Sequence, residues 1–462
     1  MWEAFPSGAW VDLRVGDRER DDPAAGADWG PERVVRAEVL CSLLLGTPES
    51  EPGRIAGIRL AGARIEGTLN LSDAAVSVKL HLLNCLLPDT LWLADASIKG
   101  VRLRGCDLYR LQAERARIDG LLDLDGTTVR HGIRLDNAHV MGQLRLSRAR
   151  VYAPTEQTRP DESRMRDVLR APHLTEPDHG RQNHDWALWA GGLTVDGGAF
   201  MRNTRTVGGL RLIGARLHGG LYLEGTTIEG RGDWAVHGDR LQTVEIAMSR
   251  GFTATGTIRL RGARIDGVLS FDLARLQAPG RVLHLSHMQV EELILRPESI
   301  SGEVSLSYSR IGVLLDDPAS WPEVIRLDGT TYESLRGHIS PARRLSWLRR
   351  DSGGYRPQPY EQLAGWYRRI GDDHGARRVL LEKQRARRAT LSLPGKVWGL
   401  LLDWAVGYGY RPWLAAIWAG LLHLTGTIVF WKYPPVRVRL DEERTFNSFV
   451  YTLDLLVPVS LF

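Results

Sequence analysis

The chain has 462 residues, of which 60 are Lys or Arg and 55 are Asp or Glu, so its formal net charge is only +5. Its three cysteines are too few for a disulfide framework. Residues 1–10 lack the apolar stretch of a secretory signal, so we expect the start of the chain to be intracellular. The charge balance does not indicate a nucleic-acid partner, and the length alone would allow about two or three ordinary domains.

One apolar pattern recurs nine times in a row between residues 58 and 151, with a period of ten or eleven residues. Each unit reads apolar, polar, apolar, two spacers, a small residue, a spacer and an aliphatic residue, as in IRLAGARI at residues 58–65. The pattern returns at residue 210 and continues in looser copies to residue 332. Self-similarity at a fixed short period predicts a solenoid rather than a series of compact domains.

The alternation within each unit has the period of a β-strand, with the first and third side chains inside and the middle one in water. The small slot is usually Ala, but it holds Cys85 and Cys106 in two units, which we expect to stack as thiols on neighbouring coils. Glycine often lies two residues after the aliphatic residue, where it suits a turn with positive φ or a close backbone approach. These glycines are Gly67, Gly100, Gly120 and Gly142.

One unit is too short to bury its own apolar face, so units must stack, and two units give a coil of about 22 residues. The small-x-aliphatic step resembles the repeats of pentapeptide-repeat and related right-handed parallel β-helix proteins, stretched from five-residue steps to an alternation of five and six. The resemblance implies a right-handed coil. The sequence thus predicts a mainly β fold, a right-handed parallel β-helix of about 11-residue half-coil units over residues 56–340.

Residues 1–55 predict an N-terminal segment that ends in a helix, because the apolar spacing is helical from Pro31 until Gly46 closes it. The open end of a solenoid exposes strand edges and core. We therefore expect this helix to cap the first coil.

Residues 152–190 interrupt the repeat with a charged insertion, and insertions in solenoids often map to a binding face. The candidate surface site consists of its His and Asp residues: His173, Asp178, His179, His184 and Asp185. These side chains could bind a metal, but their spacing matches no established ligand pattern, and a solvated loop is the preferred interpretation. The sequence therefore assigns no metal, cofactor or catalytic residue.

The β period ends near residue 340, and residues 341–393 predict a basic helical pair, over 359–370 and 372–389, that would close the second end of the solenoid. Asp372 is the expected N-cap of the second helix, and the late arginines suit its C-terminus. Five arginines are candidate contacts with anionic inner-leaflet lipids: Arg377, Arg378, Arg385, Arg387 and Arg388.

Residues 394–462 predict a membrane region that opens with a Trp-containing interfacial stretch at 397–404. A charge-free run at about 412–431 is long enough to cross a bilayer core and has Trp near both ends. The second apolar segment, 446–462, contains Asp454 as an intramembrane polar candidate and is either re-entrant or spanning. The preceding arginines place the solenoid on the cytoplasmic side of the cell membrane. A buried helix of a soluble protein is the alternative.

Short motifs extend beyond the repeat: WEAFP at residues 2–6, WGPER at 29–33, PYEQLA at 359–364 and FVYTLD at 449–454. Together with the solenoid they resemble, over nearly the whole chain, a family of uncharacterised actinobacterial proteins often labelled "membrane-associated oxidoreductase". Relatives continue past the second apolar segment. The resemblance implies a membrane location but supplies no catalytic motif. The sequence has no GxGxxG between strand and helix, no CxxC, no GxSxG and no P-loop.

The sequence favours a non-enzymatic, membrane-tethered cytoplasmic scaffold that presents a rigid surface to an unidentified protein partner. The first alternative is a membrane-associated oxidoreductase, which rests on the resemblance alone. The second, weaker alternative makes the C-terminal segments part of an oligomeric pore. GYGY at residues 407–410 faintly resembles a channel filter, but it precedes the spanning run and lacks the Thr-Val start. No cofactor is expected.

Overall fold

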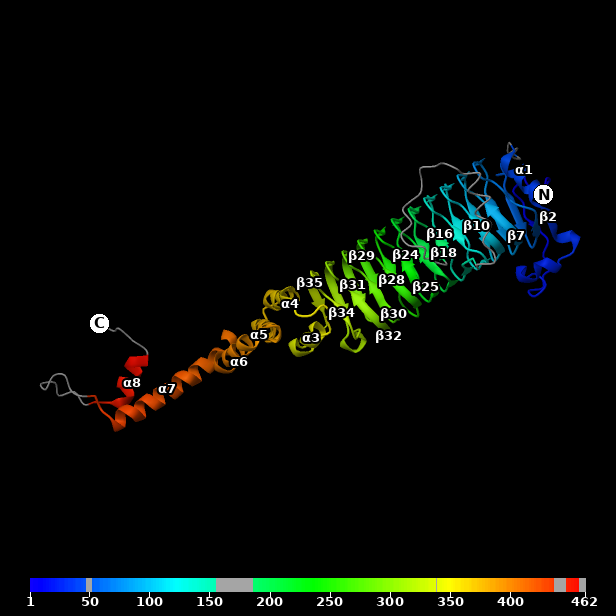
Figure 1. Cartoon of the computed structure of the whole chain (residues 1–462). Helices are drawn as coiled ribbons and strands as arrows, with labels where there is room; N and C mark the ends of the chain where they lie inside the picture. The colour runs from blue at the N-terminus through cyan, green and yellow to red at the C-terminus, as the bar shows by residue number, and fades with distance from the viewer. Residues whose placement is uncertain (47–51, 155–185, 338, 436–445, 457–462) are drawn as a thin grey trace, which may run out of the picture. The chain divides into compact units, whose positions relative to one another are not determined.

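The computed structural model describes residues 1–46, 52–154, 186–337, 339–435 and 446–456. The chain divides into two compact units, one of Met1–Ile339 with Arg349–Ser352 and one of Ser340–Leu348 with Gly353–Phe462. The first unit, blue to yellow-green in Figure 1, is a parallel β-solenoid. The second unit, yellow to red, is helical in its described part.

The solenoid makes about 11 turns, and its described strands stack into two parallel sheets, of 20 and 15 strands. In the middle coils each turn contributes two short strands to each sheet, and in later coils these merge into one longer strand, such as β29 (Arg264–Ser270). In one coil, β13 (Thr128–Val129) and β14 (Ile133–Arg134) lie in the second sheet, and β15 (His139–Val140) and β16 (Leu144–Arg145) lie in the first. Val129 pairs with Val151 of the next coil, a step of 22 residues. The predicted solenoid and coil length are confirmed.

The first sheet consists of β1 (Val11–Asp12), β3 (Ile58–Ala61), β5 (Ala75–Val76), β6 (Leu80–Leu83), β8 (Ser97–Ile98), β9 (Val101–Arg104), β11 (Arg117–Ile118), β12 (Leu122–Asp123), β15, β16, β19 (Thr194–Val195), β20 (Ala199–Phe200), β23 (Arg216–Leu217), β24 (Leu221–Tyr222), β26 (Gln242–Thr243), β27 (Ile246–Ala247), β29 (Arg264–Ser270), β31 (Gln289–Leu295), β33 (Arg310–Asp316) and β35 (Thr331–Arg336). The second consists of β2 (Val34–Arg36), β4 (Arg64–Glu66), β7 (Leu86–Trp92), β10 (Asp107–Gln112), β13, β14, β17 (Arg150–Tyr152), β18 (Trp186–Trp189), β21 (Arg205–Val207), β22 (Gly209–Arg211), β25 (Thr227–His237), β28 (Thr253–Arg259), β30 (Arg275–His284), β32 (Ser299–Ser305) and β34 (Ile325–Arg326).

The corners of the coil explain the small slot of the repeat. Asn137 has a φ of 56°, and the following Ala138 donates its N–H to the carbonyl of Leu135 at 3.0 Å, which closes a tight turn. The same left-handed conformation precedes the small slot at Asp73, Asp95, Arg115, Arg148 and Asn203. At another corner, a Cβ on Gly142 would lie 2.6 Å from the carbonyl oxygen of Gly120, so the predicted close backbone approach is confirmed there.

The core is built of columns that repeat once per coil. One column of leucines is fully buried: Leu60, Leu82, Leu103, Leu124 and Leu146. The small slot also forms a column, in which Cys85 donates its backbone N–H to the Sγ of Cys106 at 3.4 Å. Both cysteines are buried free thiols, as predicted. A hydroxyl in this slot reaches back one coil, as Thr204 Oγ1 does to the carbonyl of Leu146 at 2.6 Å.

Two middle residues of the repeat, Gln112 and Asp123, are buried, whereas the alternation places them in water. Asp123 is covered because its carboxylate accepts from Arg104 Nε at 2.6 Å and from the N–H of Asp125 at 3.1 Å. The pattern gives the direction of a side chain, but it does not show which side chains of neighbouring coils will cover it.

The helix predicted from Pro31 is wrong in its first part. Residues 31–33 form a 3-10 turn, Val34–Arg36 form β2, and α1 runs only over Ala37–Leu45. The two β-branched residues pair with β4 instead, Val35 opposite Ile65. β1 likewise pairs with β3, so the N-terminal segment adds a strand to each sheet before the first repeat.

The predicted insertion is also too long, because residues 186–190 belong to the solenoid. β18 pairs on both sides, with Leu188 opposite Ile133 in one coil and opposite Leu210 in the next. Trp186 and Leu188 are buried, so this strand continues the repeat with larger side chains. Its Trp residues do not match the apolar-polar-apolar template, which is why the sequence pattern missed it.

The helical unit contains α3 (Pro341–Leu348), α4 (Pro357–Arg369), α5 (Asp373–Ala389), α6 (Leu393–Val406), α7 (Pro412–Lys432) and α8 (Ser448–Leu456). The predicted pair corresponds to α4 and α5. Asp372 caps α5 by accepting the N–H of Gly375 at 2.7 Å, as expected. The short α3 was not predicted, so three helices rather than two occupy residues 341–393.

Candidate membrane-anchoring site

The five candidate residues of the insertion, His173, Asp178, His179, His184 and Asp185, lie outside the described residues. Within the described ranges, no group of three or more His, Cys, Asp or Glu side chains is arranged to hold a metal ion. The remaining predicted site residues are the arginines of α5 and Asp454 of α8. All of them lie in the helical unit.

The arginines of α5 divide into two groups. Arg377, Arg378 and Arg387 are exposed. Arg385 and Arg388 instead bind Asp403 of α6, with Nε to Oδ2 at 2.9 Å for Arg385 and Nη1 to Oδ2 at 3.2 Å for Arg388. Burial tends to raise the pKa of Asp403, but the two arginines outweigh it and hold this pKa below its ordinary value. Two of the five predicted lipid contacts are therefore engaged in fixing α5 against α6.

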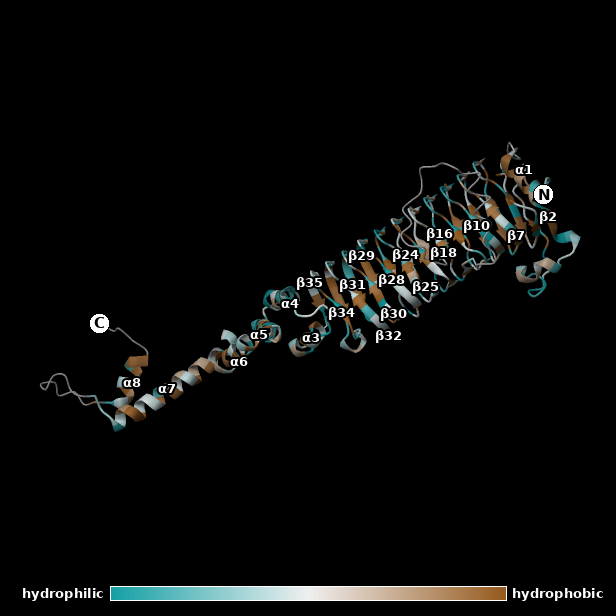
Figure 2. Ribbon diagram, viewed as in Figure 1, coloured by the Kyte–Doolittle hydropathy of each residue, from teal (hydrophilic) through white to brown (hydrophobic). Residues whose placement is uncertain are grey.

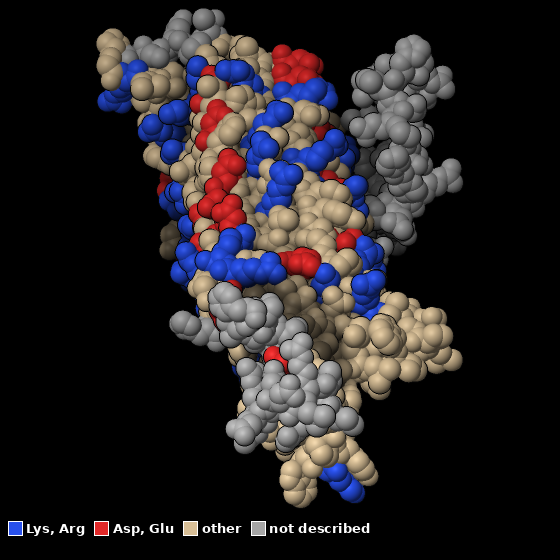
Figure 3. All heavy atoms as spheres, turned by 90° about the vertical axis from the view of Figure 1, so that its left-hand side faces the viewer, with Lys and Arg blue, Asp and Glu red and all other residues tan. Residues whose placement is uncertain are grey.

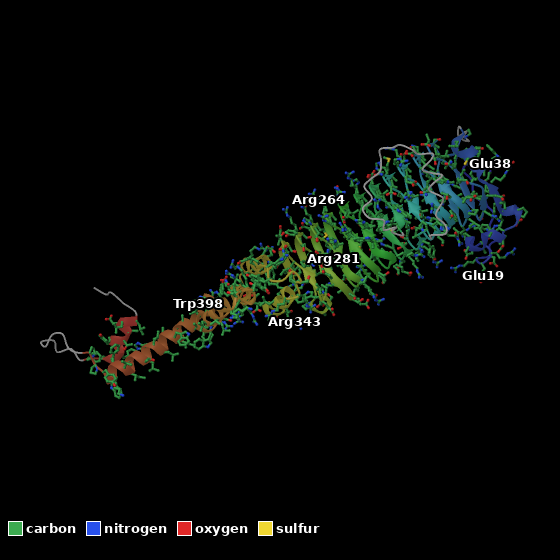
Figure 4. All side chains as sticks on the ribbon, in the orientation of Figure 1. Glu19, Glu38, Arg264, Arg281, Arg343 and Trp398 are labelled. Carbon is green, nitrogen blue, oxygen red and sulfur yellow. The ribbon has the colours of Figure 1, made fainter. Side chains whose placement is uncertain are left out.

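α6 exposes a large apolar surface for so short a helix. Trp398, labelled in Figure 4, has 63% of its surface exposed. The other exposed apolar residues of this helix are Leu393, Val397, Leu400, Leu401 and Trp404. At its end, Gly407 adopts a left-handed φ of 55°, which ends the helix before α7 begins. The Trp404 ring meets the edge of Trp418 on α7, with ring centroids 4.9 Å apart.

α7 is long and apolar enough to cross a membrane. The segment Trp413–Lys432 spans 20 residues with a mean hydropathy of 1.6, and none of it is buried. It is coloured brown to white over most of its length in Figure 2. A helix of this length covers about 30 Å, which matches the hydrocarbon core of a bilayer. The core helix of a soluble protein would be mostly buried, and this one is exposed.

α8 packs along α7 through a small-residue contact. Thr452 is buried, and its methyl group lies so close to Gly426 that a Cβ there would clash. On either side, His423 meets Phe449 and Phe430 meets Tyr451, with ring centroids 4.4 and 4.9 Å apart. The outer faces of both helices stay apolar and exposed (Figure 2). Close packing through Gly and Thr is typical of helices that associate in lipid.

Asp454 and His423 are two of the polar side chains of this helix pair. Asp454, the predicted intramembrane candidate, is exposed on α8. His423 of α7 was not singled out from the sequence, although it is the one histidine of the apolar run. Both of its ring nitrogens are buried without a hydrogen-bond partner among the described residues. The arrangement offers apolar surface and cations, which suits attachment to lipid.

No protein-family model, no curated protein and no solved structure matches the chain.

Proposed function

We propose that the protein is a membrane-anchored β-solenoid, in which α7 spans the bilayer and the solenoid presents a rigid binding surface to a protein partner in the cytoplasm. The observation that carries the proposal is the apolar helix of Trp413–Lys432, whose apolar window contains no buried residue. Exposing so much apolar surface to water would be costly, at roughly 25 cal/mol per Å². Lipid removes that cost.

The neighbouring helices support the same proposal. α6 exposes Trp398 and Trp404, and Trp rings favour the interface between lipid and water. Arg377, Arg378 and Arg387 of α5 are exposed and free to contact anionic headgroups, each worth about 1 kcal/mol near such a surface. An excess of arginine before a spanning helix favours the cytoplasmic side. The right-handed sense of the coils and the capping of the solenoid by helices are part of this proposal.

Ion pairs between neighbouring coils make the solenoid surface rigid. Arg115 binds Asp95 through two contacts of 2.7 and 2.5 Å, across one coil step. Arg281, labelled in Figure 4, binds Glu303 at 2.7 Å, and Arg326 of the following coil binds the same glutamate at 2.8 Å. Figure 3 shows Lys and Arg side chains beside bands of Asp and Glu. A surface whose charges are fixed by neighbours suits recognition of a protein by complementary charge.

The membrane attachment is tested by extraction of the full-length protein from cell membranes with alkaline carbonate. We expect the wild-type chain to stay in the membrane fraction. Ile417→Arg with Leu421→Arg should release it, because each central Arg costs about 2.5–3.5 kcal/mol on insertion. The matched control, Met141→Arg with Val244→Arg, adds the same charge at similarly exposed positions of the solenoid, 41% and 43%, and should stay membrane-bound. Release of the wild-type protein by carbonate would contradict the proposal.

A further inference from the structure

A pocket of about 610 Å³ opens on the first sheet, over the first coils of the solenoid. Its floor is formed by the N-terminal parts of β3, β6 and β9 and by the corners that precede them. In this sheet Arg59 pairs with His81, and His81 pairs with Arg102, so these three side chains form one outward column. Neighbouring strands of a sheet lie about 4.8 Å apart, so the column spans about 10 Å.

Gly57, Gly100 and Gly120 line the pocket, so its corners carry no side chains of their own. A Cβ on Gly120 would lie 2.7 Å from the carbonyl oxygen of Lys99. Further along the same column the corresponding residues are Phe200 and Tyr222, whose rings stack 5.0 Å apart and lie over Gly198 and Gly220. The coils of Phe200 and Tyr222 thus fill the glycine corner with aromatic rings, whereas the first coils surround it with basic side chains.

The charges around the pocket are unbalanced. Arg59, Lys79, Lys99 and Arg102 line it, and Asp119 is the one carboxylate in the lining among the residues that the structure describes. Lys99 already binds Asp119, at 3.0 Å, and Arg117 binds it as well, at 3.2 Å. Asp123, the next residue of the column, binds Arg104 at 2.6 Å.

Three cations are left without a carboxylate. Arg59, Lys79 and Arg102 form no ion pair within the part of the chain that the structure describes. They differ in this from Arg115, Arg130, Arg145 and Arg259, which bind carboxylates of adjacent coils.

The imidazole of His81 lies in the positive potential of these cations. Its ring is half-buried and meets the edge of Trp10 at a centroid distance of 4.7 Å. Burial, together with Arg102, Arg104 and Arg59, lowers the pKa of His81 to about 4. The imidazole is therefore neutral at pH 7. It can donate a hydrogen bond into the pocket without adding a charge that would need a counterion.

We propose that this pocket binds a small soluble molecule that carries two linked phosphoryl groups, with Arg59, Lys79 and Arg102 as its cationic contacts. Guanidinium and ammonium groups are the usual partners of phosphate oxygens. A ligand with two phosphoryl groups can contact cations at both ends of the column, Arg59 and Arg102, about 10 Å apart, which a single small anion spans less well. The site lies in the solenoid and is independent of the membrane anchor.

Isothermal titration of the full-length protein in neutral detergent with inorganic pyrophosphate tests the proposal. We expect saturable binding that weakens about tenfold for Lys79→Met and for Arg102→Gln, since losing one charged hydrogen bond is worth about a factor of ten or more. Arg216→Gln is the control, because Arg216 is exposed on β23 and is not in the pocket. The melting temperature of each variant shows that the solenoid remains folded.

The absence of saturable pyrophosphate binding would overturn the proposal. Equal weakening by Arg216→Gln, or unchanged affinity in both pocket variants, would overturn it as well. Inorganic phosphate and phosphatidylglycerol vesicles serve as comparison probes. Tighter binding of either one than of pyrophosphate would assign the pocket to a single anion or to a lipid headgroup and would also overturn it. Because the anchor variants leave the pocket intact, failure here does not bear on membrane attachment.

Discussion

Arg385 of α5 and Asp403 of α6 form a two-pronged ion pair, with Nε to Oδ2 at 2.9 Å and Nη2 to Oδ1 at 3.0 Å. Arg388 adds a third contact to the same carboxylate. The Asp403 side chain is 14% exposed, so water screens the pair only in part. This carboxylate is a polar connection between the basic helix and the apolar helix that follows it.

Asp403→Asn should weaken the contact between α5 and α6 by about 1–2 kcal/mol, because it leaves two arginines without their carboxylate. The folded-state pKa of Asp403 is lowered, so its contribution is complete at neutral pH and is lost only as pH falls below the ordinary value of 3.8. Hydrogen exchange of α6 at pH 7 measures the effect. Arg377→Gln, at an exposed arginine, should leave the exchange unchanged.

Ala138→Arg should collapse the solenoid locally, since Ala138 is only 1% exposed and a guanidinium there is both overpacked and unpaired. Arg134→Ala, in the same coil, removes an exposed side chain that lies 3.6 Å from Glu114. Its loss should cost less than about 1 kcal/mol. Thermal melts of the two variants measure the difference, and similar losses would contradict the assigned inward and outward positions.

Substitution by Val should have opposite effects on stability at Thr204 and at Thr206. Both are buried, but the Thr204 hydroxyl donates to Leu146, whereas the Thr206 hydroxyl has no partner among the described residues. Thr204→Val should destabilise the protein by about 1 kcal/mol, and Thr206→Val should stabilise it by a similar amount. Chemical denaturation measures both. The same sign for both variants would show that hydroxyl pairing in the core does not decide stability.

Arg102→Gln should raise the pKa of His81 from about 4 toward its ordinary value of 6.5, because Arg102 is the largest cationic contributor to the shift. Burial against Trp10 and the charges of Arg59 and Arg104 remain, so the recovery will be partial. Titration of the imidazole resonances by NMR measures this pKa. The depressed pKa also means that protonating His81 favours unfolding as pH falls from 6.5 toward 4. An unchanged pKa in the variant would contradict the proximity of the two side chains.

The sequence predicted the solenoid well because each coil repeats one local rule. The alternation of apolar and polar residues predicts a strand, and the small residue of each unit marks a corner. Ala138 illustrates this, because it is buried and follows Asn137, whose backbone is left-handed. The left-handed positions themselves were missed, because Asp, Asn, Arg and Gly all occupy them and no residue type stands out. β2 was missed for a related reason, since the spacing of Val34 and Val35 fits a helix equally well when the partner strand is unknown.

The candidate sites were harder to predict, because they depend on contacts between distant residues. The arginine run was visible in the sequence, but nothing in it showed that Arg385 and Arg388 would bind Asp403. The basic pocket was not predicted at all. It arises because Arg59, Lys79 and Arg102 come from three successive coils and because the acidic residues nearby bind other arginines. Charge pairing between coils cannot be read from one linear sequence.

The most direct test of the membrane-anchored account is the immersion depth of α7 in reconstituted vesicles. A nitroxide at Leu422→Cys, which is 59% exposed on α7, is compared with one at Val244→Cys, 43% exposed on the solenoid. Cys41, Cys85 and Cys106 are replaced by Ala in both proteins. The account predicts that Leu422→Cys collides with oxygen more often than with a water-soluble nickel complex, and that Val244→Cys shows the reverse. Preferential collision with the nickel complex at both positions would contradict it.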